Sequence, residues 1–370
     1  MIHNIQPGDK TKGDFHFFDF KPLIGMKKIL KQVVGIDVAQ KELVVSLGRM
    51  YEDLSTQIYA CKTFPNQSNG FIALVGWVNQ LTDQQVLPGY VMEATGVYHE
   101  SLAYFLAEKG HLVSIVLPNK ISNYFRTLEV KTITDKTSSQ AITLFGLERK
   151  LDTWKKPAGI FKKLRQLTRE RDQLIQHRTM TKNQLHAEQA EAEPNKSSVT
   201  RFKKQIIFFN KQEQQIRAEL EALLKQDKQV SSSVKLICSL SGIGVLTATT
   251  ILAETNGFEL IRNKRQLVSY AGFDVREKQS GTSVKGKARI SKKGNKYLRK
   301  AMHMPALSAI RSDERFKAVF ARLVSKHGIK MKAVVAVQRK LLELIYTIYK
   351  TNTPYDKDFL KKLESSITAP

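Results

Sequence analysis

The sequence predicts an α/β domain followed by a mostly helical region, and three observations carry this prediction. Residues 29–150 alternate between apolar, strand-like runs and segments with helical spacing. Residues 160–227 repeat apolar positions at heptad-like intervals, and residues 231–350 have helical patterns with short breaks. We expect an N-terminal extension (1–28), an α/β domain (29–155), a coiled-coil hairpin (156–230), a helical domain (231–350) and a tail (351–370).

The α/β region opens with strands and then switches to strand–helix units. VVGIDVAQ and KELVVSLGRM read as two successive strands, and we expect a third in the stretch around CKTFPNQ. NGFIALVGWVNQL and YHESLAYFLAEKG have helical spacing, whereas GYVMEAT and HLVSIVLP are strand-like. Hairpin strands followed by βα units indicate a mixed sheet, as in ribonuclease H-like domains.

Two long helices are expected next, separated by EAEPNKSSV, whose proline stops the first helix. In the second helix Glu213 occupies one slot of a seam that otherwise reads Phe202, Ile206, Phe209, Ile216, Leu220 and Leu223. The first helix keeps the rhythm less cleanly, with Leu164, Leu167, Arg171, Leu174, Arg178, Thr181 and Leu185. This pattern predicts an antiparallel helical hairpin; two helices packed on a globular body are the alternative.

Positive charge dominates the chain and is concentrated near its end. The formal net charge is +26 and the pI is about 9.9, which indicates a polyanionic partner. From Arg262 to Lys300 there are thirteen lysines or arginines but only two acids, Asp274 and Glu277. A solvated face would mix its signs, so we expect a nucleic-acid surface. Its candidate residues are Arg276, Lys278, Lys285, Lys287, Arg289, Lys292, Lys293, Lys296 and Arg299.

A short glycine-containing turn, Ser241-Gly242-Ile243-Gly244, separates two helical runs. It has the pattern of a helix-hairpin-helix turn, in which Gly242 and Gly244 let the backbone approach a phosphate beside a helix N-terminus. An ordinary corner between two helices is the alternative.

Other classes of protein are disfavoured by composition. Cys61 and Cys238 have no Cys or His at metal-ligand spacing, so we expect neither a zinc site nor a disulfide framework. No apolar run is long enough to span a membrane, and the N-terminus lacks the continuous apolar stretch of a signal peptide. We therefore expect a protein of the reducing cytoplasm.

Three carboxylates stand where a metal site could form. Asp37 ends an apolar strand, Glu93 follows Val91 and Met92 in another, and Asp135 opens a helical segment. A buried, unpaired carboxylate is costly, so these acids need a partner or a metal, and Mg²⁺ prefers such oxygen ligands. The simpler interpretation makes Asp135 an N-cap. Their order and strand context favour a magnesium site that acts on phosphodiesters.

These motifs resemble those of insertion-sequence transposases of the IS110 and IS1111 type, and they are similar to Piv-type site-specific DNA invertases. The N-terminal landmarks are GIDVAQKE, MEATGVYHE and TDKTSSQAI. The C-terminal landmarks are LSGIGVLTATTILAE, LVSYAGFDVREKQSG and GKARISKKGNKYLRKA. The match covers nearly the whole chain from about residue 29. It implies a RuvC-like domain with an Asp-Glu-Asp-Asp set, a coiled-coil linker and a helical transposase domain.

The resemblance assigns roles to individual residues. Asp37, Glu93 and Asp135 match the first three acids, and Ser138 stands where the fourth is expected. A hydroxyl is a weak Mg²⁺ ligand, so the chain is an inactivated variant, a decayed copy, or one that takes its fourth ligand from elsewhere. Ser280 matches the family's nucleophilic serine, which forms a phosphoserine intermediate; on its own it would read as a turn residue beside Gly281.

The resemblance also implies partners. A structured bridge or seek RNA would pair with donor and target DNA, and a dimer or a synaptic tetramer would cut two duplexes at the bacterial nucleoid. Three other functions remain open: a Piv-like invertase without guide RNA, a nuclease or resolvase that hydrolyses branched DNA, and a non-catalytic binder.

Overall fold

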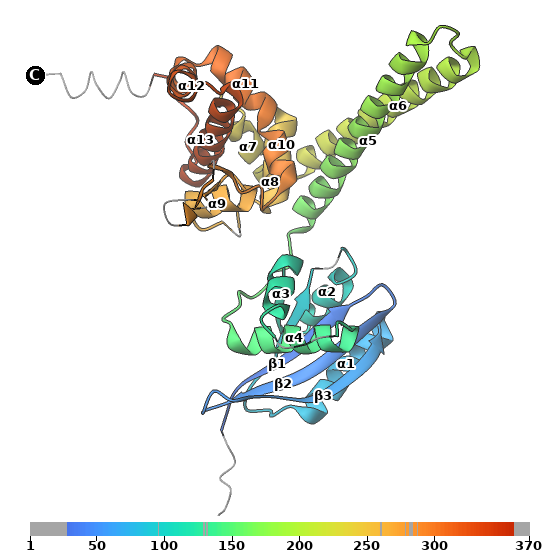
Figure 1. Cartoon of the computed structure of the whole chain (residues 1–370), viewed down its shortest axis with the longest axis vertical. Coiled ribbons are helices and arrows are strands. Elements are labelled where there is room, and N and C mark those ends of the chain that lie inside the picture. The colour runs from blue at the N-terminus through green and yellow to red at the C-terminus, as the bar shows by residue number, and fades with distance from the viewer. Residues whose placement is uncertain are drawn as a thin grey trace, which may run out of the picture. The chain divides into compact units, whose positions relative to one another are not determined.

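The computed structural model describes residues 28–94, 96–128, 130, 132–259, 261–277, 279–280, 284–286 and 288–358. The chain divides into two compact units, Met1–Lys156 and Pro157–Pro370. Figure 1 shows a sheet with its helices in the first unit and helices almost throughout the second. Most of the expected N-terminal extension, the last twelve residues of the expected tail, and Lys278 and Lys287 lie outside the described residues.

The first unit is built on a five-stranded mixed sheet with the order β3-β2-β1-β4-β5. Its strands are β1 (Ile29–Val38), β2 (Glu42–Tyr51), β3 (Thr56–Pro65), β4 (Gly89–Glu93) and β5 (Leu112–Val116). Antiparallel pairing joins β1, β2 and β3, whereas β4 pairs in parallel with both β1 and β5. The predicted ribonuclease H-like mixed sheet is confirmed, although β3 begins upstream of the CKTFPNQ stretch.

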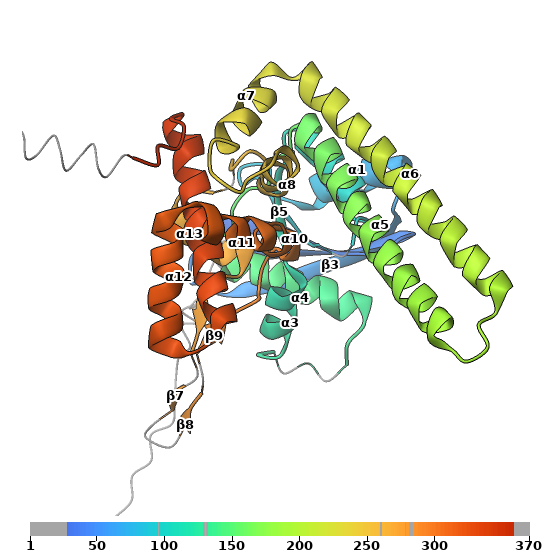
Figure 2. The same cartoon turned by 90° about the horizontal axis from the view of Figure 1, so that it is seen from above.

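Helices cover both faces of this sheet (Figure 2). On one face, α1 (Ser68–Leu81) and α2 (Glu100–Glu108) pack Leu74 and Leu106 against Ile36, Met92 and other buried strand residues. On the opposite face, α3 (Pro118–Phe125) and α4 (Asp135–Glu148) pack against Val33 and Val91. Because successive strand residues point to opposite faces, the even-numbered residues of β1 serve the first core and the odd-numbered ones serve the second.

The second unit begins with the predicted helical hairpin, formed by α5 (Gly159–Ala190) and α6 (Lys196–Gln226) and drawn in green in Figure 1. The Asn195 side chain caps α6 by accepting the N–H groups of Ser197 and Ser198. The most buried seam residues are Leu164, Leu167, Thr181, Glu213, Ile216, Leu220 and Leu224. At the base of the hairpin, the seam therefore continues into the core of the unit that follows.

Seven more helices complete the second unit within the described residues. They are α7 (Lys228–Ile237), α8 (Val245–Thr255), α9 (Lys264–Ala271), α10 (Lys296–Ala301), α11 (His303–Ser312), α12 (Glu314–His327) and α13 (Lys330–Thr351). The amphipathic helix expected near the end is α13, whose Val337, Leu341 and Ile345 are fully buried. None of the helices in the described ranges is long and apolar enough to cross a membrane.

The break in the helical pattern between α9 and α10 contains short strands that the sequence pattern did not predict. Four two-residue strands lie there: β6 (Val275–Arg276), β7 (Gln279–Ser280), β8 (Val284–Lys285) and β9 (Arg289–Ile290). β6 pairs with β9, and β7 pairs with β8, both antiparallel. The frequent lysines and arginines of this segment obscured the β-branched residues Val275, Val284 and Ile290 that favour strands.

Candidate active site and basic ribbon

Asp37 and Glu93 lie beside each other at the carboxyl ends of two parallel strands. The register of β1 and β4 pairs Ile36 with Met92, so the two acids follow at the next position of each strand. Since side chains alternate along a strand, both carboxylates project to the face that α4 covers. On this face, Val33 and Val91 pack in one core with residues of α4. Gly35 lies directly against the backbone of α4.

Asp135 is the first residue of α4 and not its N-cap, which corrects the simpler interpretation of this residue. The cap is Thr134, whose hydroxyl accepts the Thr137 N–H at 3.2 Å, while the Thr137 hydroxyl accepts the Thr134 N–H at 2.8 Å. This capping box leaves the exposed Asp135 carboxylate in the first turn, where the helix dipole favours negative charge.

The start of α4 is held over the acids by close packing along β1. A Cβ atom on Gly35 would lie 2.2 Å from Thr143 Oγ1 and 2.7 Å from the Ser139 carbonyl oxygen, so only glycine permits this approach. Ser139 and Ser46 share a buried hydrogen bond of 2.7 Å between their hydroxyls. Because Gly35 meets the second and third turns of α4, the first turn, with Asp135 and Ser138, extends towards Asp37.

The three acids interact electrostatically. Burial, followed by the negative charges of Asp135 and Glu93, raises the pKa of Asp37 to about 6, although the Val38 backbone N–H opposes this. Like charges that repel one another are stabilised by a cation, and carboxylate oxygens are the ligands that Mg²⁺ prefers. The donor chemistry therefore fits a divalent cation. As the side chains stand, no group of three or more His, Cys, Asp or Glu in the described ranges is gathered closely enough to hold one.

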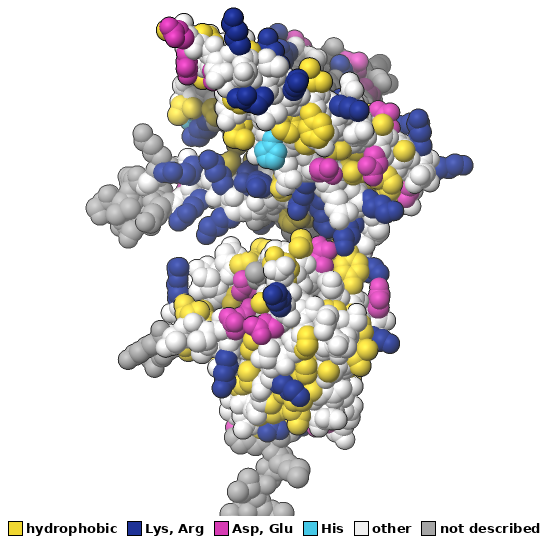
Figure 3. Space-filling model, turned by 90° about the vertical axis from the view of Figure 1, so that its right-hand side faces the viewer, with side chains coloured by type: hydrophobic (Ala, Val, Ile, Leu, Met, Phe, Trp, Pro, Cys, Tyr) yellow, Lys and Arg dark blue, Asp and Glu magenta, His cyan; other side chains and the backbone are white. Residues whose placement is uncertain are grey.

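Ser138, where the resemblance leads us to expect a fourth acid, lies near Glu93. It is half-buried and lines one cavity together with Glu93. Its side chain is neutral, and its place in a cation site stays a prediction. Figure 3 shows acidic side chains gathered on one face of the first unit.

The basic segment of the second unit forms a ribbon, defined here as the paired strands β6–β9 and β7–β8. Arg276 and Arg289 are exposed and lie directly opposite each other across β6 and β9. Ser280 pairs through its backbone with Val284 in the part of the ribbon that projects from the helices (Figure 2). The side chains of Ser280 and Lys285 lie outside the described set.

Two opposed arginines repel each other, so this pairing is unfavourable unless an anion lies nearby. Lys292, Lys293 and Lys296 are also exposed where the ribbon returns to α10. Lysines and arginines are spread over the face of the second unit in Figure 3. This concentration of exposed positive charge makes the ribbon the strongest candidate for a polyanion-binding surface in the described part of the second unit.

A buried acid that the sequence reasoning missed links the hairpin to Asn295, the N-cap of α10, which follows the ribbon in the chain. The side chain of Glu254 in α8 is 1% exposed and accepts two hydrogen bonds from Arg169 of the hairpin, at 2.7 and 2.8 Å. It also accepts one from Asn295 Nδ2 at 2.6 Å, and Asn295 caps α10 through the Tyr297 and Leu298 N–H groups. The only signal in the sequence was an acid ending the apolar run TTILAE.

Two predicted nucleic-acid residues have structural contacts. Arg299 Nη1 donates to the carbonyls of Ala271 and Gly294, at 2.8 and 3.1 Å. Gly242 has φ +89°, and a Cβ there would lie 3.0 Å from the Pro305 carbonyl oxygen in α11. By contrast, Gly244 is the N-cap of α8, and a Cβ atom there would meet nothing within 4 Å. Binding of nucleic acid by these three residues stays a prediction.

Comparison with known proteins identifies the family. The family described as Transposase IS116/IS110/IS902 matches residues 234–321, and the IS110-type DEDD family described as Transposase matches residues 34–189. The chain belongs to the IS110-type transposases. The two matched segments cover the three acids, Ser138, the ribbon and the network around Glu254.

Relatives of this transposase include proteins that invert DNA. A pilin gene-inverting protein from Moraxella lacunata is 27% identical over 332 residues, which covers 88% of this chain and 98% of the relative. Its counterpart from Moraxella bovis is 26% identical over the same extent. An uncharacterised 43.6 kDa protein of insertion element IS110 from Streptomyces coelicolor is 24% identical over 151 residues, 41% of this chain and 36% of the relative.

Among solved structures, a Thermus thermophilus RuvC in complex with a Holliday junction substrate covers 33% of this chain and 99% of its own, with 9% identity and a TM-score of 0.26.

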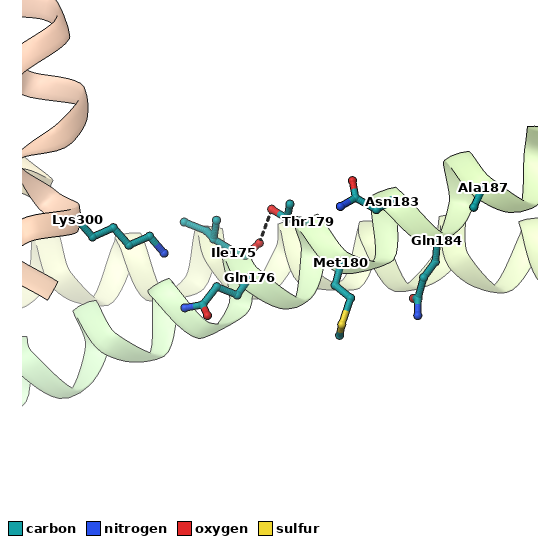
Figure 4. Close-up of a pocket in the computed structure, with 8 residues that line it drawn as sticks. All are labelled: Ile175, Gln176, Thr179, Met180, Asn183, Gln184, Ala187 and Lys300. Atoms are coloured by element: carbon teal, nitrogen blue, oxygen red, sulfur yellow. Dashed lines mark hydrogen bonds between the residues drawn. The ribbon is translucent and has the colours of Figure 1, made fainter. Parts of the chain in front are cut away.

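One groove of the second unit of the transposase runs along α5 and is not lined by ribbon residues. Figure 4 shows Ile175, Gln176, Thr179, Met180, Asn183, Gln184 and Ala187 along one face of α5, with Lys300 at the end nearest the helical body. Lys300 forms an ion pair with Asp172, and Gln176 Nε2 donates to the same carboxylate at 2.7 Å. Apart from the paired lysine its lining is neutral, so it offers no acid–base or nucleophilic chemistry.

Proposed function

We propose that this transposase cuts and rejoins DNA through a covalent bond to Ser280. The Ser280 hydroxyl gives up its proton as its oxygen attacks the scissile phosphorus, a phosphoserine bond forms, and the bond from phosphorus to the leaving deoxyribose oxygen breaks. That oxygen takes up one proton and leaves as a hydroxyl, so the number of protons is unchanged. Rejoining reverses these steps on a different strand end. Since a serine hydroxyl is a weak nucleophile near neutral pH, the step needs the help of nearby charged groups.

The observation that carries this proposal is the β1–β4 register, which sets Asp37 beside Glu93 under the first turn of α4. We infer that Asp37, Glu93 and Asp135 would hold Mg²⁺, which when bound would supply positive charge against the negative charge that develops on the phosphate oxygens. The ribbon and the lysines that follow it would hold the DNA backbone and neutralise the same developing charge.

The resemblance to the family implies the proposed partners, and the charge is consistent with them. A surplus of 26 positive charges suits a load of structured guide RNA together with donor and target duplexes, although DNA alone would also account for it. From the resemblance we propose that a bridge or seek RNA selects the DNA, and that the protein acts as a dimer or a synaptic tetramer. The test is to purify the protein with its RNA and digest that RNA; recombination must then stop and return when the RNA is added back.

A Piv-like invertase that recognises DNA directly is the second candidate, because two relatives matched over 88% of the chain are named pilin gene-inverting proteins. Recombination that survives complete removal of RNA would favour this function. Both candidates share the nucleophile, so both predict that Ser280→Ala abolishes recombination between plasmid-borne element ends while DNA binding survives. Full recombination by Ser280→Ala would contradict both, and free DNA ends as the product would favour a hydrolytic nuclease.

Ser138 gives a separate test of the acidic site. Ser138→Asp adds a fourth carboxylate beside Glu93, so divalent cation affinity, measured by calorimetry, should rise about tenfold or more. Ser138→Asn, which adds bulk without charge, serves as the control and should leave the affinity near that of the unmodified protein. Equal affinities for all three proteins would show that Ser138 does not face the cation site, or that another ligand replaces it.

A further inference from the structure

A cavity of about 450 Å³ opens beside the acids, between α3 and the start of α4. Glu93 and Ser138 form the wall that it shares with the acidic site. The opposite wall comes from α3 and the residue after it, with Asn119, Ser122, Phe125 and Arg126. Its volume falls within the range of about 300 to 1,000 Å³ that is typical of small-molecule sites.

The walls of this cavity combine apolar surface with hydrogen-bonding groups. Phe125 is half-buried, and Ile133, which also lines the cavity, is 74% exposed. Asn119, Ser122 and Arg126 are exposed and offer amide, hydroxyl and guanidinium groups. The loops that leave the same sheet edge carry two more exposed apolar residues, Val97 at 68% and Leu117 at 58%. An apolar rim around a charged site marks a surface that meets a ligand.

The chemistry of the lining matches one particular ligand. A base in a duplex hides its faces by stacking, so a duplex offers this cavity only phosphates and groove edges. An unpaired base exposes an apolar face that packs on aromatic or aliphatic side chains, and an edge that bonds to amides and hydroxyls. A guanidinium binds the attached phosphate. A nucleotide bound in this cavity would lie directly beside the carboxylates.

We propose that this cavity binds one unpaired nucleotide next to the scissile phosphate, so that the acids act on DNA that is locally opened. The inference rests on the proposed function, because it takes the phosphate at the acids to be the one that is cut. It assigns the base to Phe125 and Ile133, the base edge to Asn119 and Ser122, and the phosphate to Arg126. These residues thereby select opened DNA over paired DNA.

The test compares two synthetic DNA duplexes that differ at one position, where one carries an unpaired 5-iodouridine and the other is fully paired. The full-length protein binds them with Ca²⁺ in place of Mg²⁺, so that no cleavage is required. We expect tighter binding of the duplex with the unpaired nucleotide, and a photocrosslink that mass spectrometry maps to Phe125. Ile133→Ser and Arg126→Gln should each lower this preference about fivefold or more.

Ile72→Ser is the matched control, because Ile72 on α1 is 65% exposed but lies away from the cavity lining. It should keep the full preference. Because Ile133 and Arg126 are exposed, their variants should fold normally, which urea unfolding checks. An unchanged preference in both variants, or crosslinks only outside the cavity, would overturn the proposal. The proposal would also be overturned if the two variants lost self-association but kept the preference for the unpaired nucleotide. That result would show that a protein segment fills the cavity.

These binding measurements do not depend on Ser280. Ser280→Ala protein should therefore show the same preference and the same crosslink. If recombination proves independent of Ser280 while the cavity variants still lose the preference, the cutting proposal fails and the nucleotide site stands. If recombination requires Ser280 but the variants behave like the unmodified protein, only the nucleotide site fails.

Discussion

Gly35 and Asp37 lie on the same face of β1, and each contributes differently to the acidic site. Gly35 lets α4 approach the strand, and Asp37 receives the first turn of that helix. The hydrogen bonds of Ser139 and Thr143 fix the helix at this distance, with Thr143 Oγ1 donating to the Ser139 carbonyl at 2.8 Å and to the Ser46 carbonyl at 3.2 Å. The spacing of the carboxylates thus depends on side chains that carry no charge.

Gly35→Ala should therefore damage both the fold and the site. Its methyl group would lie 2.2 Å from Thr143 Oγ1, and relief of that overlap must move α4 away from β1. We expect the free energy of unfolding in urea to fall by about 1 to 3 kcal/mol, with a larger relative loss of recombination because Asp135 moves with the helix.

Gly76→Ala is the control for Gly35→Ala. Gly76 is exposed within α1, and a Cβ there meets nothing within 4 Å. Alanine should raise the free energy of unfolding by up to about 1 kcal/mol, because glycine is a poor helix former. If Gly35→Ala proved as harmless as Gly76→Ala, the close approach of α4 would not position the acids.

At the scale of elements, the hairpin contains a buried acid in its seam. Glu213 on α6 is 8% exposed in its side chain, and it accepts hydrogen bonds from Arg171 and Arg178 of α5 and from Arg217 of its own helix. Burial alone would raise the pKa of Glu213, but the three guanidinium groups outweigh burial and lower it to about 2. Three cations around one anion make this layer sensitive to the loss of the anion.

Glu213→Gln should lower the free energy of unfolding by about 3 to 5 kcal/mol at neutral pH, since it leaves the arginines facing one another. Because the folded pKa lies below the ordinary value, the ionised carboxylate stabilises the fold above about pH 4.5 and ceases to do so as the pH falls to about 2. The difference between Glu213→Gln and the unmodified protein should shrink over that interval in urea unfolding. Glu219→Gln, at an exposed position of α6, is the control and should have little effect at any pH.

The ribbon is the second element that carries a prediction. Arg276→Gln removes one of two opposed cations, so unfolding in urea should be unchanged or slightly harder. DNA binding should weaken, and the slope of log Kd against log salt concentration should fall by about 1, because one phosphate contact is lost. Arg322→Gln, at an exposed position on α12, is the comparison. Equal losses at both positions would mean that DNA contacts are spread over the unit and are not concentrated in the ribbon.

At the scale of the whole molecule, each unit has its own core, and the groups proposed for the chemistry are divided between the units. The strands and helices of the first unit were predictable because their apolar periods are clear and Asp37 and Glu93 end apolar runs. The contacts that set their spacing were not, since Gly35, Ser139 and Thr143 have no distinctive pattern. The same holds for Glu254, whose partners Arg169 and Asn295 are distant in sequence.

In the proposed reaction, Ser280 and the acids act on one phosphate. The most direct measurement is the recovery of a covalent protein–DNA adduct from recombination reactions, with its position mapped by mass spectrometry. We expect an adduct at Ser280 that disappears in both Ser280→Ala and Asp37→Asn, although both variants still bind DNA. An adduct at another residue, or one that forms undiminished in Asp37→Asn, would contradict it.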